Sequence, residues 1–253
     1  CIFANTNFIQ NLSIDANNLL IMTHVTMHQE RCDDCLFRRL SVGFVSNDDF
    51  NKLIKKSVYL KFEKGDTILK QGAVSTHLLF LHHGTVKFNY QDEQAKNLIM
   101  TVVSAPKLLG GANMFYRNTN IFSICALEDC DVCMIDIHEF KQLLLNNPKY
   151  AMALFEKSME MFEVSIFNFI SLAHKNVNGR IADILIYLAD AVYKSMDFTL
   201  NLTRKELAEF AGCSVENVIN TLSRMHKDGI LELEGKHLKI TDRKKLTLIS
   251  KAG

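Results

Sequence analysis

Two cysteines separated by two residues are the side chains of this sequence best suited to bind a metal or to change redox state. They are Cys32 and Cys35, which enclose two aspartates. Thiolates at this spacing are compatible with a zinc site or with a dithiol–disulfide switch. The chain has 7 cysteines in 253 residues, and an odd number in a chain long enough to bury its own core does not indicate a disulfide framework. We therefore expect a reduced, cytoplasmic protein.

Composition and motif content exclude several other classes of protein. The 29 basic and 28 acidic residues give a net charge of +1. No apolar run in the sequence approaches the roughly 18–20 residues that a membrane helix needs. A glycine-rich phosphate loop, a nucleophile elbow and a His-Glu metal helix are all absent from the sequence. We therefore do not expect the protein to be an enzyme, to contain catalytic residues or to have a membrane partner.

Residues 1–26 are expected to be a leader or non-native segment without order. They are rich in asparagine and have neither a basic n-region nor a small-residue cleavage site, so a secretory signal is not expected. Met22 and Met27 are candidate starts of the native protein. We divide the remaining chain into residues 27–147, which begin with the Cys-x-x-Cys segment, residues 148–177 and residues 178–253.

Residues 27–147 are predicted to be a β-sandwich or barrel. Short apolar runs with turn signals between them follow one another at spacings of roughly ten residues, which is typical of such folds. The runs are Val58–Leu60, Thr67–Leu69, Leu78–Leu81, Val86–Tyr90, Leu98–Val103 and Val132–Ile135. Glycine accepts a positive φ without steric cost, which predicts turns at Gly65, Gly72, Gly84 and Gly110.

A long helix is predicted over residues 148–177. Asn147 is expected to cap it, and Pro148 suits its first turn. Small and apolar residues then recur at alternating spacings of four and three, which indicates a heptad seam. The seam is Ala151, Phe155, Ser158, Phe162, Ser165, Phe169 and Leu172. The two serines weaken this pattern, and the alternative is that the helix simply packs on its own domain. A seam that holds three phenylalanines, on a helix that links two domains, favours a parallel partner helix and hence a homodimer.

Residues 178–253 show the pattern of a winged helix-turn-helix. One amphipathic helix spans Ile181 to Val192, a second begins at a capping box on Thr203 and ends at Gly212, and Ser214 caps a third that reaches Lys227. Two short strands, Ile230–Leu233 and His237–Ile240, form a hairpin with Lys236 and His237 at its turn. The third helix can enter a DNA major groove while the hairpin rests on the backbone. Residues 175–253 hold 13 basic and 10 acidic residues, which supports this interpretation moderately.

These motifs, in this order, resemble the CRP/FNR transcription regulators. The helix-turn-helix is similar over Leu202–Ala208 and Gly212–Val218, and the β-roll over Phe62–Gly72 and Leu81–Lys87. The resemblance implies an α+β fold, with an N-terminal β-roll of the cyclic-nucleotide-binding jelly-roll type, a long dimerisation helix and a C-terminal winged helix-turn-helix. It implies a homodimeric, sequence-specific regulator of transcription that binds near-palindromic promoter DNA under control of an effector or redox signal. RNA polymerase is a candidate further partner.

The resemblance also assigns residues to the DNA. The residues that match Glu216 and Asn220 face base edges, and those that match Thr203 and Ser214 contact phosphates. Relatives usually carry Arg at the position of Asn220, and asparagine suits adenine, so we expect a half-site altered at that base pair. Val215 is similar to FNR rather than to CRP. The predicted DNA-binding set is Thr203, Arg204, Ser214, Val215, Glu216, Asn217, Asn220, Arg224 and Lys236.

The effector of the β-roll stays open between several classes. The family's phosphate cassette has a Glu directly after a Gly and an Arg about ten residues later. This chain has Gly110-Gly111-Ala112-Asn113 and Thr119–Ser123 there, with only Arg117 nearby, so cAMP is disfavoured because a phosphate needs a paired cation.

Resemblance to the FNR oxygen sensors implies an iron–sulfur cluster on Cys32, Cys35 and Cys130. Ser41 stands where the third N-terminal ligand would be, so this set is incomplete, although Cys125 or Cys133 could supply a ligand. The alternatives are zinc, a thiol switch, haem held by His82, His83 or His138, another small ligand, or no effector at all. A different class of function is a β-roll regulatory module that acts through protein partners without DNA.

Overall fold

The computed structural model describes residues 35–110 and 119–253. Several predictions lie outside these ranges: the leader over residues 1–26 with Met22 and Met27, the thiol of Cys32, and the cassette positions from Gly111 to Asn113 with Arg117. The predictions that can be compared with the structure concern the β-roll, the long helix and the C-terminal module.

Two four-stranded antiparallel sheets form the β-roll. Their strand orders are β1-β8-β3-β6 and β2-β7-β4-β5. The strands are β1 (Val58–Phe62), β2 (Thr67–Leu69), β3 (His77–His83), β4 (Thr85–Gln91), β5 (Asn97–Ser104), β6 (Lys107–Leu109), β7 (Ser123–Ala126) and β8 (Cys130–Asp136). All six apolar runs lie in strands, which confirms that prediction, and the four predicted turn glycines have positive φ. β6 and β7 were not predicted.

Strand β3 shows why the roll is buried on two sides. Side chains alternate across a strand, so Leu79 and Leu81 enter the core between the sheets while Leu78 and Phe80 enter a second core on the outer face. Three helices cover that outer core, and none of them was predicted from sequence. They are α3 (Leu36–Ser41), α4 (Asn47–Lys55) and α5 (Ile137–Asn146).

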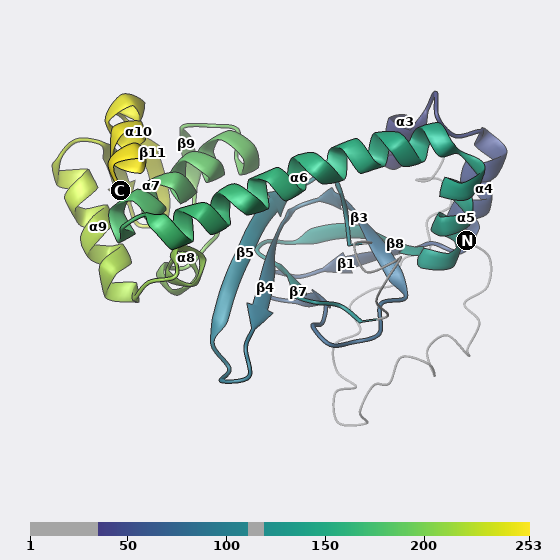
Figure 1. Cartoon of the computed structure of the whole chain (residues 1–253), viewed down its shortest axis with the longest axis horizontal. Coiled ribbons are helices and arrows are strands. Elements are labelled where there is room, and N and C mark those ends of the chain that lie inside the picture. Colours follow the sequence, from purple (N-terminus) through teal and green to yellow (C-terminus); the bar gives the residue numbers. More distant parts are fainter. Residues whose placement is uncertain (1–34, 111–118) are drawn as a thin grey trace.

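The long helix α6 (Pro148–His174) links the roll to the C-terminal module, and Figure 1 shows it running from α5 along the strands to α7. Asn147 is its N-cap residue, but the predicted side-chain cap was wrong. Only this residue separates α5 from α6, and its amide group donates to the carbonyl of Leu143 in the last turn of α5 at 2.9 Å.

The C-terminal module has the predicted helix-turn-helix and hairpin. It consists of α7 (Val177–Tyr187), a π-helical turn (Leu188–Val192), β9 (Asp197–Thr199), α8 (Arg204–Ala211), α9 (Val215–Lys227), β10 (Leu231–Glu234), β11 (His237–Ile240) and α10 (Arg243–Ala252). The predicted first helix therefore continues beyond α7 as a π turn. β9 joins the hairpin as a third strand, and neither β9 nor α10 was predicted.

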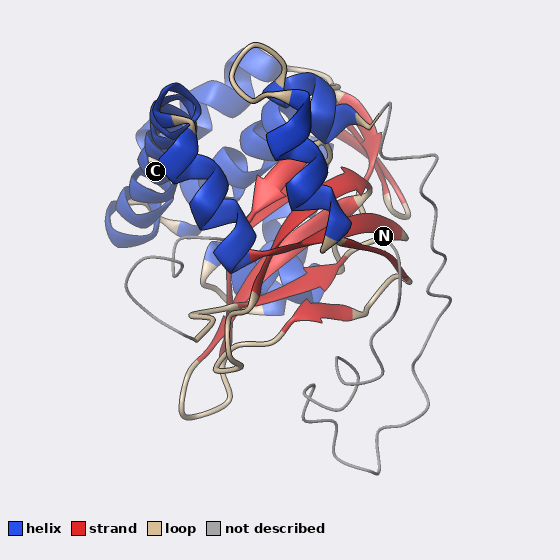
Figure 2. Cartoon of the chain, turned by 90° about the vertical axis from the view of Figure 1, so that its right-hand side faces the viewer, coloured by secondary structure: helices blue, strands red, loops and turns tan. Residues whose placement is uncertain are grey.

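Figure 2 shows helices gathered on one side of the strands when the molecule is viewed end on. Across residues 35–110 and 119–253, no helix is long and apolar enough to cross a membrane.

Candidate nucleic-acid interface

Two local features of the sequence set the bounds of α8, the helix that precedes the turn to α9. The Thr203 hydroxyl accepts from the Glu206 N–H at 3.1 Å, and the Glu206 carboxylate accepts from the Thr203 N–H at 2.7 Å, which completes the predicted capping box. Gly212 ends α8 with φ +57°. A Cβ at Gly212 would lie 3.1 Å from a methyl of Leu172, so the turn packs closely on the end of α6.

Helix α9 presents a polar face outward because its apolar face is fixed in the core. Val218, Thr221, Leu222 and Met225 are buried, and they recur at the three- and four-residue spacing of one helix face. Ser214 caps the helix by accepting from the Asn217 N–H at 3.1 Å. In their caps, the hydroxyl oxygens of Ser214 and Thr203 accept hydrogen bonds and do not donate them. The hydroxyl proton of each residue therefore stays available for a phosphate oxygen.

The predicted DNA-binding residues lie mainly on this exposed surface. Eight of the nine are exposed: Thr203, Ser214, Val215, Glu216, Asn217, Asn220, Arg224 and Lys236. Arg204 is partly buried, burial lowers the pKa of its guanidinium, and it donates to the wing carbonyl of Gly235 at 3.4 Å. The Arg224 guanidinium bonds to the Asn178 side chain on α7. Arg204 and Arg224 therefore bind to other parts of the C-terminal module in this structure.

One exposed apolar residue of this surface was missed by sequence reasoning. Ile219 is 47% exposed on the same outward half of α9. Its position three residues after Glu216 would have placed it there, but an aliphatic residue directly after Val218 resembles a core position.

The proposed dimer seam is largely open on α6. Phe155, Phe162 and Phe169 are 56%, 58% and 70% exposed. The two serines of the seam donate to carbonyls of their own helix: Ser158 to Leu154 at 2.8 Å and Ser165 to Met161 at 3.1 Å. Their hydroxyls are therefore satisfied if the seam is covered, which removes the objection that the sequence raised. Ala151 and Leu172 are half-buried.

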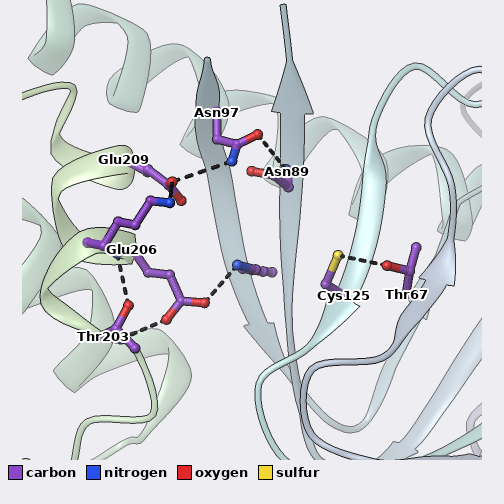
Figure 3. Close-up of polar contacts among 9 residues, drawn as sticks. Thr67, Asn89, Asn97, Cys125, Thr203, Glu206 and Glu209 are labelled. Carbon is purple, nitrogen blue, oxygen red and sulfur yellow. Dashed lines mark hydrogen bonds and ion pairs between the residues drawn. The ribbon is translucent and has the colours of Figure 1, made fainter. Parts of the chain in front are cut away.

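A second polar surface of α8 faces the β-roll rather than solvent. Lys87 of β4 pairs with Glu206 at 2.7 Å, and both side chains are less than one-fifth exposed. Asn97 of β5 donates to Glu209 at 3.4 Å, and Figure 3 shows these two side chains turned toward one another. Burial disfavours the charged form of Glu206, but hydrogen bonds from Lys87 and Thr203 outweigh it and lower the pKa of this carboxyl group.

Backbone groups also join the two domains. The Tyr187 hydroxyl donates to the Val102 carbonyl at 2.7 Å, and the Ser104 hydroxyl donates to the Val192 carbonyl at 2.9 Å. The predicted boundary between sensor and DNA-binding segments is therefore crossed by a packed contact.

The candidate metal ligands that the structure describes do not share one environment. Cys130 is 2% exposed in the core between the sheets, whereas Cys35 packs against the outer core and its sulfur caps α3 by accepting from the Arg38 N–H. Cys133 also packs against the outer core, so Cys130 and Cys133 point to opposite faces of β8. Within the described ranges, no group of three His, Cys, Asp or Glu residues is arranged to hold a metal ion.

The remaining candidate ligands lie in the β-roll and on α5. Burial lowers the pKa of His82, whose ring lies edge-on to Phe80, while His83 ends β3 and His138 is the second residue of α5. Cys125 on β7 lies 3.7 Å from the Thr67 hydroxyl (Figure 3). Cys213 packs against the core of the C-terminal module.

Comparisons with known proteins match both halves of the chain. A cyclic nucleotide-binding domain matches residues 59–147, and a Crp-like helix-turn-helix domain matches residues 179–249. The chain is 27% identical over 180 residues to the cAMP-activated global transcriptional regulator CRP of Salmonella typhimurium, covering 70% of this chain and 86% of the relative. It is 24% identical over 233 residues to the transcriptional activator protein FnrL of Cereibacter sphaeroides, covering 86% and 93%.

A solved structure supports the same architecture. The structure of FixK2 from Bradyrhizobium japonicum superposes with a TM-score of 0.69 at 16% identity, covering 76% of this chain and 96% of that one. At this identity the likeness establishes the fold alone.

Proposed function

The chain belongs to the CRP/FNR family of DNA-binding transcription regulators, and we propose that it acts as a homodimer on near-palindromic promoter DNA. The observation that carries this proposal is the outward polar face of α9 on a chain whose long helix leaves the three seam phenylalanines, Phe155, Phe162 and Phe169, exposed. Pairing two copies along α6 covers the phenylalanines. It also gives two copies of α9 related by a two-fold axis, which suits half-sites about one helical turn apart.

In this proposal residues 27–147 sense a signal, residues 148–177 pair the two copies and residues 178–253 bind DNA. RNA polymerase is the partner through which the bound dimer would change transcription. The alternative of a β-roll module that acts only through protein partners is disfavoured by the match to a helix-turn-helix domain.

Selection of binding sites from random duplex DNA tests the proposal, followed by affinity measurements over a range of salt concentrations. We expect a two-fold symmetric consensus and an adenine at the base pair that Asn220 reads. Replacing Asn220 by alanine should relax the preference at that pair. Replacing Lys236 by alanine should weaken binding to all sequences and reduce the salt slope by about 1. Absence of specific binding at moderate salt would contradict the proposal.

The effector domain departs from a cyclic nucleotide site where the structure describes it. Asn120 is 8% exposed, its N–H donates to Ala73 at 2.9 Å, and its amide group donates to Lys70 at 3.2 Å. The Ser123 hydroxyl accepts from the Gln71 N–H at 2.9 Å. These side chains hold the turn between β2 and β3 and carry no positive charge for a phosphate, which supports an effector other than cAMP.

An iron–sulfur cluster that includes Cys130 does not fit this structure either. A cluster ligand must be a thiolate, but burial and the nearby charge of Glu128 raise the pKa of the Cys130 thiol to about 11. The thiol donates to the carbonyls of Glu128 at 3.2 Å and Thr85 at 3.6 Å. Gly84 packs so closely that a Cβ there would lie 2.5 Å from the sulfur. We therefore assign Cys130 to the core between the sheets.

A further inference from the structure

Two large apolar side chains project from the face of α9 that is proposed to meet DNA. Ile219 is 47% exposed and Val215 is 39% exposed. The inward face of the helix already supplies Val218, Leu222 and Met225 to the core of the module. Ile219 and Val215 are therefore not needed to fill that core, and their apolar surface is open to an external partner.

Ile219 is exposed at the border between the polar face of α9 and the buried face that holds Leu222. Residues three and four apart share one side of a helix, so Ile219 neighbours Glu216 and Ser223, and Asn220 flanks the same pair. All four residues are exposed. The Ser214 cap fixes the start of α9 at Val215, which places Ile219 in the second turn, where a groove-bound helix contacts base edges.

The chemistry of this side chain selects one base. The major-groove edges of guanine, cytosine and adenine offer polar groups, which lose their water without gaining a hydrogen bond when an aliphatic side chain covers them. Thymine alone adds a 5-methyl group that an aliphatic side chain can contact favourably. We infer that Ile219 reads a thymine methyl in each half-site, beside the base pair that Asn220 reads. The inference rests on the proposed DNA-binding function and deepens it to a specificity-determining residue.

Replacing thymine by deoxyuridine removes only the methyl group and so tests the contact directly. After the consensus is known, each thymine of the half-site is replaced in turn and the dissociation constant is measured by fluorescence anisotropy. With the wild-type protein, one position should weaken binding by about fourfold per half-site, which corresponds to one buried methyl group. With Ile219→Ala, thymine and uracil at that position should bind equally well.

Leu248→Ala is the matched control, because it removes exposed apolar surface from α10, outside the proposed DNA-binding set, and should keep the penalty for uracil. Ile219 is exposed and alanine is the best helix former, so the variant is expected to fold, and circular dichroism checks this. An equal uracil penalty in wild type and Ile219→Ala overturns the inference, as does a half-site in which no thymine is sensitive. If the wild-type protein binds no sequence specifically, the proposed function fails together with the inference.

Discussion

Replacing Lys87 by methionine removes the cationic partner of Glu206 while keeping a side chain of similar length. Loss of one partner from a fully buried ion pair costs about 3–5 kcal/mol, whereas an exposed pair contributes about 0–1 kcal/mol. Here the two side chains are 17% and 19% exposed, and Glu206 keeps its bond from the Thr203 N–H. We expect Lys87→Met to lower the free energy of unfolding by about 1.5–3 kcal/mol.

A double-mutant cycle isolates the pair from the capping box. Glu206→Gln removes the charge, but glutamine still serves as the third residue of a capping box. The single variants Lys87→Met and Glu206→Gln and their combination, compared by urea unfolding, should give a coupling energy of about 1–2 kcal/mol. Lys205→Met is the control, because Lys205 is 75% exposed and 4.0 Å from Glu209. A coupling no larger than the effect of Lys205→Met would refute the reasoning.

The pH dependence of the coupling follows from the lowered pKa of Glu206. A depressed folded-state pKa gives stability that is fully present above the unfolded-state value of glutamate, about 4.3, and is lost as the pH falls through the folded-state value. The coupling energy should therefore be the same at pH 7 and pH 5.5 and should shrink below about pH 4. A coupling that weakened between pH 7 and pH 5.5 would contradict the assignment to this carboxylate.

Three further outcomes are expected. Phe162→Glu should leave a monomer in sedimentation experiments, because it places a charge in the seam, while Lys157→Glu outside the seam should stay dimeric. Gly212→Ala should lower the free energy of unfolding by about 1–2 kcal/mol, since φ is +57° and the added Cβ would press on Leu172. The Cys130 thiol, with a pKa of about 11, should be about one part in a thousand thiolate at pH 8. Mass spectrometry should then find Cys130 alkylated only after unfolding, and rapid labelling of the native protein would contradict this.

Much of the fold could be predicted because its signals are local. The six predicted strands carry apolar runs of three to six residues with turn signals between them, and the ends of α8 and α9 are marked by Thr203, Gly212 and Ser214. The missed elements lack such signals. β9 is three residues long and buries only Phe198, so it exists only because β11 pairs with it. α5 follows β8 directly after its cap Asp136, so its apolar residues extend those of the strand.

The candidate site likewise has one part that the sequence could predict and one that it could not. The outward face of α9 follows from spacing and a cap, which sequence reasoning can use. The environment of Cys130 depends on the positive φ of Gly84 and on the carbonyls of Thr85 and Glu128. Its place in the sequence suggested a ligand, but the packing buries the thiol, raises its pKa and places it against backbone carbonyls.

The contact between the domains limits how a signal can travel from the β-roll to α8. Ile99, Val102 and Leu127 of the roll belong to the same hydrophobic cluster as the core of the C-terminal module and are at most 2% exposed. Exposing such side chains costs about 1.5–3 kcal/mol each, so detaching the module costs more than the roughly 1–3 kcal/mol of a typical coupling between sites. A bound effector is therefore expected to repack β5 against α8 rather than to release the module, and the Lys87–Glu206 pair lies where that repacking must occur.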